Sequence, residues 1–178
     1  MEPKAIVYTS NTGYTAQYAQ LLSKKTGLHA YSLEEACEKV PKGTEVIYMG
    51  WIMAGKIQGF ITALKQYQVA AVCGVGMNPT GSQISVVRQV NGLGTDMPVF
   101  TLQGGLNMDK LHGFKKLILK SMGGTMGRQL MAKQNRTPEE DAILDMFRNG
   151  GNRVSMQNLK EVVSWYEQET GKKRGIGA

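Results

Sequence analysis

The chain has little of what builds disulfide frameworks, metal centres or membrane spans. Its 178 residues include only two cysteines and two histidines. Without a CxxC pair or metal-ligand spacing, we predict no metal site and two buried free thiols, Cys37 and Cys73. No apolar run approaches the ~20 residues that a spanning helix needs. The opening MEPKAIVY lacks the basic and apolar regions of a signal peptide. These absences predict a cytoplasmic protein.

The composition is that of a folded chain with an uneven charge. Hydrophobic residues make up 42% of it, enough for a sizeable core, and we expect one domain over residues 1–178. The net charge of +7 is concentrated in residues 105–136, which hold seven basic residues and one acidic one. Basic patches often bind nucleic acid, but Phe114 is the only aromatic residue of this segment, so base stacking is poorly supported.

Short apolar runs alternate with helical patterns along the chain. In the segment 33–40, Ser32 and Glu35 stand at the spacing of a capping box. Strands that alternate with helices of this length predict a parallel sheet covered on both faces, and the continuous run VAAVCGVGM fits a central strand of such a sheet. The expected strands are Ala5–Thr9, Leu28–Ser32, Glu45–Trp51, Val69–Met77 and Pro98–Gln103, and the expected helices are one from Ala16, Leu33–Val40, Ile57–Tyr67 and Ser82–Val90.

A last helix, about Ser155–Gln168, would place Leu159, Val162, Val163 and Tyr166 on one face. About fifty residues separate it from the fifth strand, which is too long for a bare loop. We therefore predict a helical insertion over about 105–152. Asp109–Met122 has a helical pattern, and Thr137-Pro138-Glu139-Glu140 is typical of a second helix start.

The stretch IVYTSNTGYTAQYAQLL joins the first strand to the first helix through hydroxyl residues and a glycine. Backbone N–H groups at such a helix start bind anions, and hydroxyls from Ser10, Thr12 and Thr15 could add hydrogen bonds. Gly13 would let the backbone approach closely. The pattern suits a phosphate held by neutral donors. An ordinary polar N-cap is the alternative.

This stretch also resembles the flavodoxin signature, with Ile6, Val7, Tyr8, Ser10, Gly13, Thr15, Ala19 and Leu22 at the signature positions. The resemblance implies a flavodoxin-like three-layer α/β/α sandwich with a five-stranded parallel sheet of order 2-1-3-4-5. It also implies FMN as cofactor. The phosphate would then be bound by Ser10, Asn11, Thr12, Gly13, Tyr14 and Thr15.

Two further loops would hold the isoalloxazine ring if the resemblance holds. They are GWIMAGK after the third strand and GMNPTGS after the fourth. Trp51 could stack on the ring, or could simply belong to the core at the end of a strand. The expected ring contacts are Trp51, Ile52, Met53, Ala54 and Gly55 in the first loop and Gly76, Met77, Asn78 and Gly81 in the second.

Two nucleotide-binding motifs are incomplete. Gly50 to Lys56 has the first seven positions of a P-loop, but Ile57 replaces the Ser or Thr that would hold magnesium. Gly74 and Gly76 begin a dinucleotide fingerprint that Met77, Asn78 and Pro79 do not continue. These departures argue against nucleotide hydrolysis and against a dinucleotide cofactor.

The segment Met108–Lys133 combines a broad apolar helical face with lysines behind it. Such a helix can lie at an anionic membrane surface or can pack on its own domain. An insertion of this composition after the fifth strand is similar to the menaquinone-dependent protoporphyrinogen oxidases, which are flavodoxin-like FMN enzymes. That similarity implies a porphyrinogen donor, a quinone acceptor and peripheral contact with the inner face of the membrane.

The sequence thus favours an FMN-dependent oxidoreductase in which the flavin performs the chemistry, and we name no catalytic side chain. A flavodoxin-type electron carrier between protein partners is the first alternative. A non-catalytic binding module on the same fold is the second.

Overall fold

A computed structural model of the chain describes residues 2–106, 132–138, 140–141 and 151–171. Strands and helices alternate along it. In chain order they are β1 (Ala5–Thr9), α1 (Tyr14–Thr26), β2 (His29–Ser32), α2 (Leu33–Lys39), β3 (Glu45–Met53), β4 (Lys56–Ile57), α3 (Phe60–Gln66), β5 (Gln68–Gly76), α4 (Ile84–Asn91), β6 (Val99–Gln103), β7 (Gly105–Leu106), β8 (Gly151–Asn152), the 3-10 turn η1 (Gln157–Leu159) and α8 (Lys160–Thr170).

The main sheet is mostly parallel. Its strands lie in the order β2-β1-β3-β5-β6, and the short β4 pairs antiparallel to β3. Counted among themselves, the five parallel strands therefore run second, first, third, fourth, fifth. Ile6 of β1 pairs with Ala30 of β2 on one side and with Ile47 of β3 on the other. The predicted α/β fold with a parallel sheet is confirmed.

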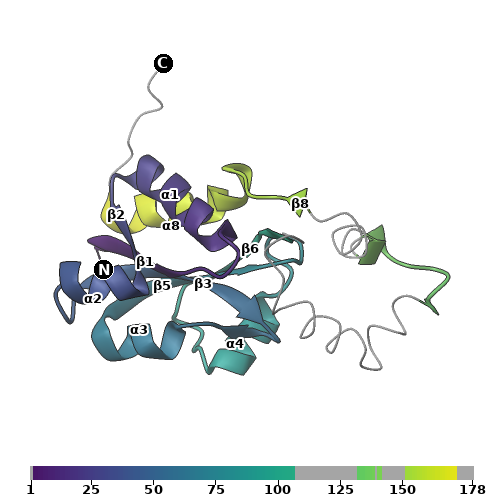
Figure 1. The fold of residues 1–178 in the computed structure, drawn as a ribbon, viewed down its shortest axis with the longest axis horizontal. Coiled ribbons are helices and arrows are strands. Elements are labelled where there is room, and N and C mark those ends of the chain that lie inside the picture. The colour runs from purple at the N-terminus through teal and green to yellow at the C-terminus, as the bar shows by residue number, and fades with distance from the viewer. Residues whose placement is uncertain (1, 107–131, 139, 142–150, 172–178) are drawn as a thin grey trace, which may run out of the picture.

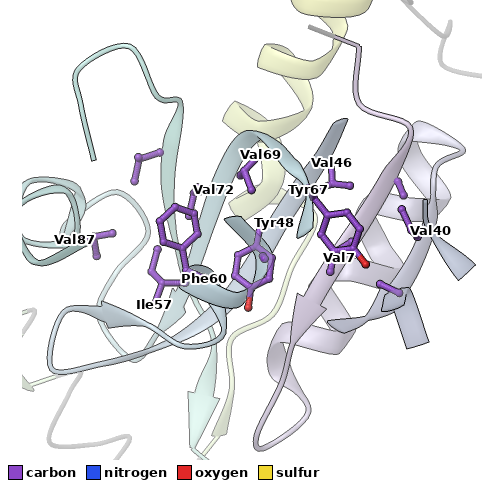
Figure 2. Packing of buried hydrophobic residues seen from close by; sticks show 14 residues of the cluster. Val7, Val40, Val46, Tyr48, Ile57, Phe60, Tyr67, Val69, Val72 and Val87 are labelled. Atoms are coloured by element: carbon purple, nitrogen blue, oxygen red, sulfur yellow. The ribbon is translucent and has the colours of Figure 1, made fainter. Parts of the chain in front are cut away.

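Helices cover both faces of this sheet (Figure 1). α1 and α8 lie on one face, and α2, α3 and α4 lie on the other. Each face has its own buried cluster. Tyr18, Leu22 and Val162 belong to the cluster under α1 and α8. The opposite cluster includes Tyr48 and Phe60, whose packing Figure 2 shows.

β5 is the strand most completely enclosed. All residues from Val69 to Val75 are buried, on both faces. A strand between two layers of helices must be apolar at every position, because neither face meets water. The prediction of an interior strand for VAAVCGVGM is therefore confirmed, since β3 and β6 flank it.

Some element boundaries, and the burial of one cysteine, depart from expectation. The first helix begins at Tyr14, two residues earlier than predicted, because Gly13 adopts a left-handed conformation with φ 96° and ends the loop. Ile57 belongs to β4 and not to the following helix, which starts at Phe60. The prediction of a buried thiol is wrong for Cys37, which is exposed on α2, and correct for Cys73.

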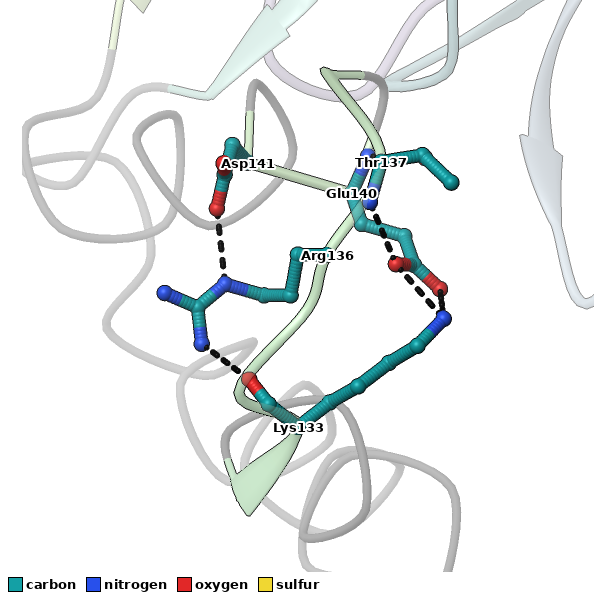
Figure 3. Close-up of polar contacts among 5 residues, drawn as sticks. All are labelled: Lys133, Arg136, Thr137, Glu140 and Asp141. Carbon is teal, nitrogen blue, oxygen red and sulfur yellow. Dashed lines mark hydrogen bonds and ion pairs between the residues drawn. The ribbon is translucent and has the colours of Figure 1, made fainter.

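The described parts of the insertion agree with a helix start at Thr137 (Figure 3). The Thr137 N–H donates to Glu140 Oε2 (2.8 Å), and the Glu140 N–H donates back to Thr137 Oγ1 (3.3 Å). Lys133 and Arg136 add ion pairs to Glu140 and Asp141 at 2.9 and 2.7 Å. The predicted helix Asp109–Met122 lies outside the described residues.

The last helix forms close to its predicted position. A 3-10 turn over Gln157–Leu159 leads into α8, which ends at Thr170. Leu159, Val162, Val163 and Tyr166 are all buried, as the periodicity predicted. No helix among the residues described here combines the length and the apolar character needed to cross a bilayer.

Candidate functional site

The loops of interest meet at the carboxyl edge of the parallel strands. The chain leaves β1 at Thr9, β5 at Gly76 and β6 at Gln103, and all these ends lie at the same edge. β1 stands between β2 and β3, so successive connections diverge from it on either side. Ligands of open α/β sheets bind at such a reversal of strand order. The segment from Ser10 to Gly13 lies directly beyond it.

This segment opens α1 without a side-chain cap. The N-cap is Gly13, whose own N–H donates to Ser10 Oγ (3.2 Å). The first helical hydrogen bond runs from the Gln17 N–H to the Gly13 carbonyl (3.0 Å). Among the described residues, no group accepts a hydrogen bond from the N–H groups of residues 14–16. The alternative of an ordinary Ser or Thr N-cap is therefore wrong, and three donors stay available to a ligand.

The side chains of this segment differ in exposure. The Thr15 residue is only 2% exposed, and within the described part of the chain its hydroxyl makes no hydrogen bond. Ser10 and Thr12 are half-buried, whereas Asn11 is exposed. The Tyr14 ring is buried in the cluster under α1. Ser10 and Thr12 are thus partly accessible, although Ser10 Oγ also accepts from the Gly13 N–H.

α2 shows what an anion does at a helix start in this molecule. Its capping box is complete, with Ser32 Oγ accepting from the Glu35 N–H (3.2 Å) and Glu35 Oε2 accepting from the Ser32 N–H (2.9 Å). Hydrogen bonds from the Ser32 backbone, then from its side chain, lower the pKa of Glu35. The start of α1 offers similar donors and no carboxylate of its own, so it is suited to an external anion.

The segment Gly50–Lys56, predicted as a loop, instead forms the end of β3, a two-residue turn and the start of β4. β3 continues to Met53 and folds back through Ala54 and Gly55 into β4, pairing Ile52 with Ile57. Both turn residues have positive φ, 50° and 79°, as a two-residue hairpin requires. The hairpin forms because β3 extends past Gly50, its last residue paired with β1, and then turns back at Ala54 and Gly55.

Glycines in this hairpin are explained by packing within the protein. A Cβ at Gly50 would lie 2.5 Å from Ile57 Cγ2, and one at Gly55 would lie 3.0 Å from Val90 Cγ2. Asn91 of α4 clamps the turn, since its Nδ2 donates to the Gly55 carbonyl (2.8 Å) and its Oδ1 accepts from the Ile57 N–H (2.9 Å). These hydrogen bonds hold the hairpin against α4 at the edge of the sheet.

Trp51 lies at the root of the hairpin. It pairs with Val75 of β5, one position beyond the last β1–β3 pair, Thr9 with Gly50. Ile52 packs against the cluster under α3 and α4, so by the alternation of a strand the Trp51 side chain faces the α1 side. It is half-buried there, on the same side as the start of α1.

The second ring loop is held against β6. The Gly81 N–H donates to the Thr101 carbonyl (2.9 Å), and Gly81 itself has φ 83°. The Met77 carbonyl accepts from Gln103 Nε2 (3.2 Å). Met77 and Asn78 are half-buried. A Cβ at Gly76 would lie 3.2 Å from Gln83 Oε1, so this glycine too is explained by close packing.

Sequence reasoning missed the residues that brace these loops from α1 and α8. The Tyr18 hydroxyl donates to the Gln103 carbonyl, and Asn158 Nδ2 donates to Tyr18 Oη (2.7 Å). Next to them, β7 and β8 pair antiparallel where the insertion leaves and returns. The glycine pair 104–105 was a sequence signal of this close packing, since a Cβ at Gly105 would lie 2.8 Å from the Tyr14 ring.

The start of α1, Trp51 and the loop after β5 therefore lie at the same edge of the sheet. Ile52 instead packs against the cluster under α3 and α4. Met53 and Ala54 are exposed on the hairpin. Among the described residues, no group of three or more His, Cys, Asp or Glu side chains is placed to hold a metal ion. Comparisons with models of protein families and with curated proteins find no match. A proposal of function therefore depends on the residues of this chain alone.

Proposed function

We propose that this chain is a flavodoxin-like protein that binds FMN and works in redox chemistry, as an FMN-dependent oxidoreductase. One observation carries the proposal: α1 begins with uncapped N–H groups beside the Thr15 side chain, whose hydroxyl makes no hydrogen bond among the described residues, at the sheet edge where the strand order reverses. Together with the signature residues of this segment, that arrangement favours a phosphate monoester attached to a flat ring system.

The donor set fits a phosphate. Amide N–H groups of residues 14–16, with hydroxyls from Ser10, Thr12 and Thr15, supply directional hydrogen bonds to its oxygens. Residues 9–17 carry no charged side chain, so the helix dipole and neutral donors would balance the phosphate charge. A carboxylate such as the one that caps α2 would compete with the ligand, and α1 has no acidic residue in its first turn.

The neighbouring elements offer surfaces for the ring. Trp51 supplies a half-buried aromatic face on the α1 side, and offset stacking is worth about 0.5–1.5 kcal/mol beyond area burial. The loop after β5 would offer the ring the backbone groups of Gly76, Met77, Asn78 and Gly81. The hairpin would offer those of Met53 to Gly55. A bound flavin would supply electron transfer, and these groups would orient it and adjust its potential.

An FMN titration tests this proposal. Purified protein should quench FMN fluorescence at one-to-one stoichiometry and induce a visible circular-dichroism band. Riboflavin shares the ring but lacks the phosphate, so it should bind at least about tenfold more weakly, since hydrogen bonds to a charged group contribute about 1.5–3 kcal/mol. Equal affinity for the two flavins would contradict the phosphate site. No binding of either would reject the function and favour a binding module without a cofactor.

The donor and acceptor remain a separate prediction. The basic composition of residues 105–136 favours anionic or membrane-associated partners, such as porphyrinogen as donor and quinone as acceptor, over the acidic docking surfaces typical of flavodoxin carriers. FMN-loaded protein should then oxidise a porphyrinogen when a soluble quinone is supplied. If it reduces protein acceptors in exchange assays but leaves porphyrinogen untouched, the electron-carrier alternative is the better description.

A further inference from the structure

Gln103, the last residue of β6, bonds to Met77, Thr80 and Tyr18, which lie in two segments at the sheet edge. Its side-chain Nε2 donates to the Met77 carbonyl (3.2 Å), and its backbone N–H donates to Thr80 Oγ1 (3.0 Å). Its carbonyl accepts from the hydroxyl of Tyr18 on α1. One residue thus contacts both the loop after β5 and the helix whose start forms the candidate anion site.

The contacts continue into the base of the insertion. Asn158 Nδ2 donates to Tyr18 Oη (2.7 Å) and to the Arg153 carbonyl (2.9 Å). The Arg153 N–H donates to the Gly104 carbonyl (2.8 Å), and the Gly104 N–H donates to the Gly76 carbonyl (2.7 Å). The chain directly after β6 is therefore tied to the loop after β5 and to the chain that returns from the insertion.

Tyr18 is suited to this role. Its ring is fully buried, and burial raises the pKa of its phenol, so the hydroxyl stays protonated and can donate at neutral pH. This hydrogen bond is partly buried, so removing the Tyr18 donor would leave the Gln103 carbonyl incompletely satisfied. Tyr18 and the Gln103 carbonyl therefore hold α1 and the end of β6 at one separation.

We propose that Gln103 is a positioning residue that joins the Met77–Gly81 loop to α1, and so sets the ring-binding loop relative to the phosphate-binding helix start. The expected effect on a flavin rests on the proposed function. The link between the loop and α1 through Gln103 does not. Among the described residues, its side chain bonds to the Met77 carbonyl alone, and its main chain bonds to Thr80 and Tyr18. These links can be removed one at a time.

The first test needs no cofactor. Gln103→Leu removes the donor to Met77 and should raise amide hydrogen exchange in residues 77–81 about two- to tenfold, as expected for one lost hydrogen bond. Gln68→Leu, at the exposed opposite end of β5, is the matched control and should leave this exchange unchanged. Tyr18→Phe keeps the buried ring and should raise exchange in the same loop, although residue 18 lies on α1.

The second test uses a flavin and a rescue. An ionised carboxylate cannot donate to a carbonyl, whereas a protonated one can. FMN-loaded Gln103→Glu should therefore show a shifted visible spectrum near neutral pH that returns toward wild type as the new carboxyl protonates, from about pH 6 downward. Gln103→Leu should show the shift at every pH. A merely structural role would not produce this reversal.

The outcomes separate the two proposals. If FMN binds normally and neither loop exchange nor spectrum changes in Gln103→Leu, the positioning role is overturned. It is also overturned if Tyr18→Phe alters exchange only within α1. If the wild type binds no FMN, the proposed function fails, and the exchange measurements alone then decide whether Gln103 joins loop and helix: faster exchange supports the joint, and unchanged exchange refutes it.

Discussion

Thr15 and Thr26 stand at opposite ends of α1 and differ in what their hydroxyls do. Both side chains are buried, at 2% and 6% exposure. Thr26 Oγ1 donates to the Leu22 carbonyl (2.8 Å), whereas Thr15 has no partner among the described residues. The Thr26 hydroxyl bonds within its own helix, whereas the Thr15 hydroxyl lies at the proposed anion site and makes no such bond among the described residues. Each can be replaced by valine, which has nearly the same shape.

Thr15→Val should weaken FMN binding about tenfold or more, because it would remove the proposed hydrogen bond to the charged phosphate. Thr26→Val should lower the free energy of unfolding by about 1 kcal/mol and leave FMN affinity unchanged. Calorimetric titration and urea unfolding measure the two effects. Equal loss of affinity in both variants would mean that Thr15 acts through stability alone.

The two cysteines should differ in reactivity. Burial raises the pKa of the Cys73 thiol to about 12, and its side chain is inaccessible in β5, whereas Cys37 is exposed on α2. Only the thiolate attacks an alkylating reagent. Mass spectrometry after iodoacetamide treatment of native protein at about pH 8 should show one adduct, at Cys37, and a second only after denaturation. Rapid native labelling of Cys73 would contradict the fold around β5.

At the scale of elements, local signals worked where the chain's own neighbours decide the outcome. The capping box at Ser32 and Glu35 forms as the spacing predicted, and so does the one at Thr137 and Glu140. The hairpin β3–β4 was missed because its two-residue turn, Ala54 and Gly55, follows an apolar run without a clear break. The residue that holds the turn, Asn91, lies 34 residues beyond its partner Ile57. No local pattern contains that contact.

The capping box predicts a pH dependence of stability. The pKa of Glu35 lies below its ordinary value of 4.5 in the folded protein, because Ser32 donates to the carboxylate. Its contribution is thus present above about pH 5 and is lost as the pH falls through the folded pKa. Glu35→Gln should flatten this part of the curve of unfolding free energy against pH. Ser32→Ala should cost about 0.5–2 kcal/mol near neutral pH.

Urea unfolding between about pH 3 and 7 measures both effects. Glu34→Gln is the matched control, since its carboxylate lies on the same helix turn outside the capping box. A pH profile for Glu35→Gln identical to that of the wild type would show that the box has no energetic weight.

At the scale of the molecule, the sheet separates two buried clusters. Ile47 belongs to the cluster under α1 and α8, and Ile57 belongs to the one under α3 and α4. Replacing each with valine should cost about 0.5–1.5 kcal/mol. Because the side chains lie in clusters on opposite faces, the double variant should lose the sum within about 0.5 kcal/mol.

Fluorescence and circular dichroism should report the same urea midpoint for each of these variants, because one sheet serves both clusters. Different midpoints for the two probes would mean that the faces unfold separately. A coupling energy well above about 0.5 kcal/mol would mean that the sheet transmits strain between them.

The sequence by itself determined the order and type of the main elements, because hydrophobic period, glycine and capping residues act over a few positions. It also placed the hydroxyl-rich segment at the end of a strand. Only the tertiary structure decided that β3 continues into a hairpin, that Cys37 is exposed, and that Tyr18 meets the carbonyl of Gln103, 85 residues further on. Such contacts depend on how the layers pack, and packing joins residues whose separation along the chain leaves no local signal.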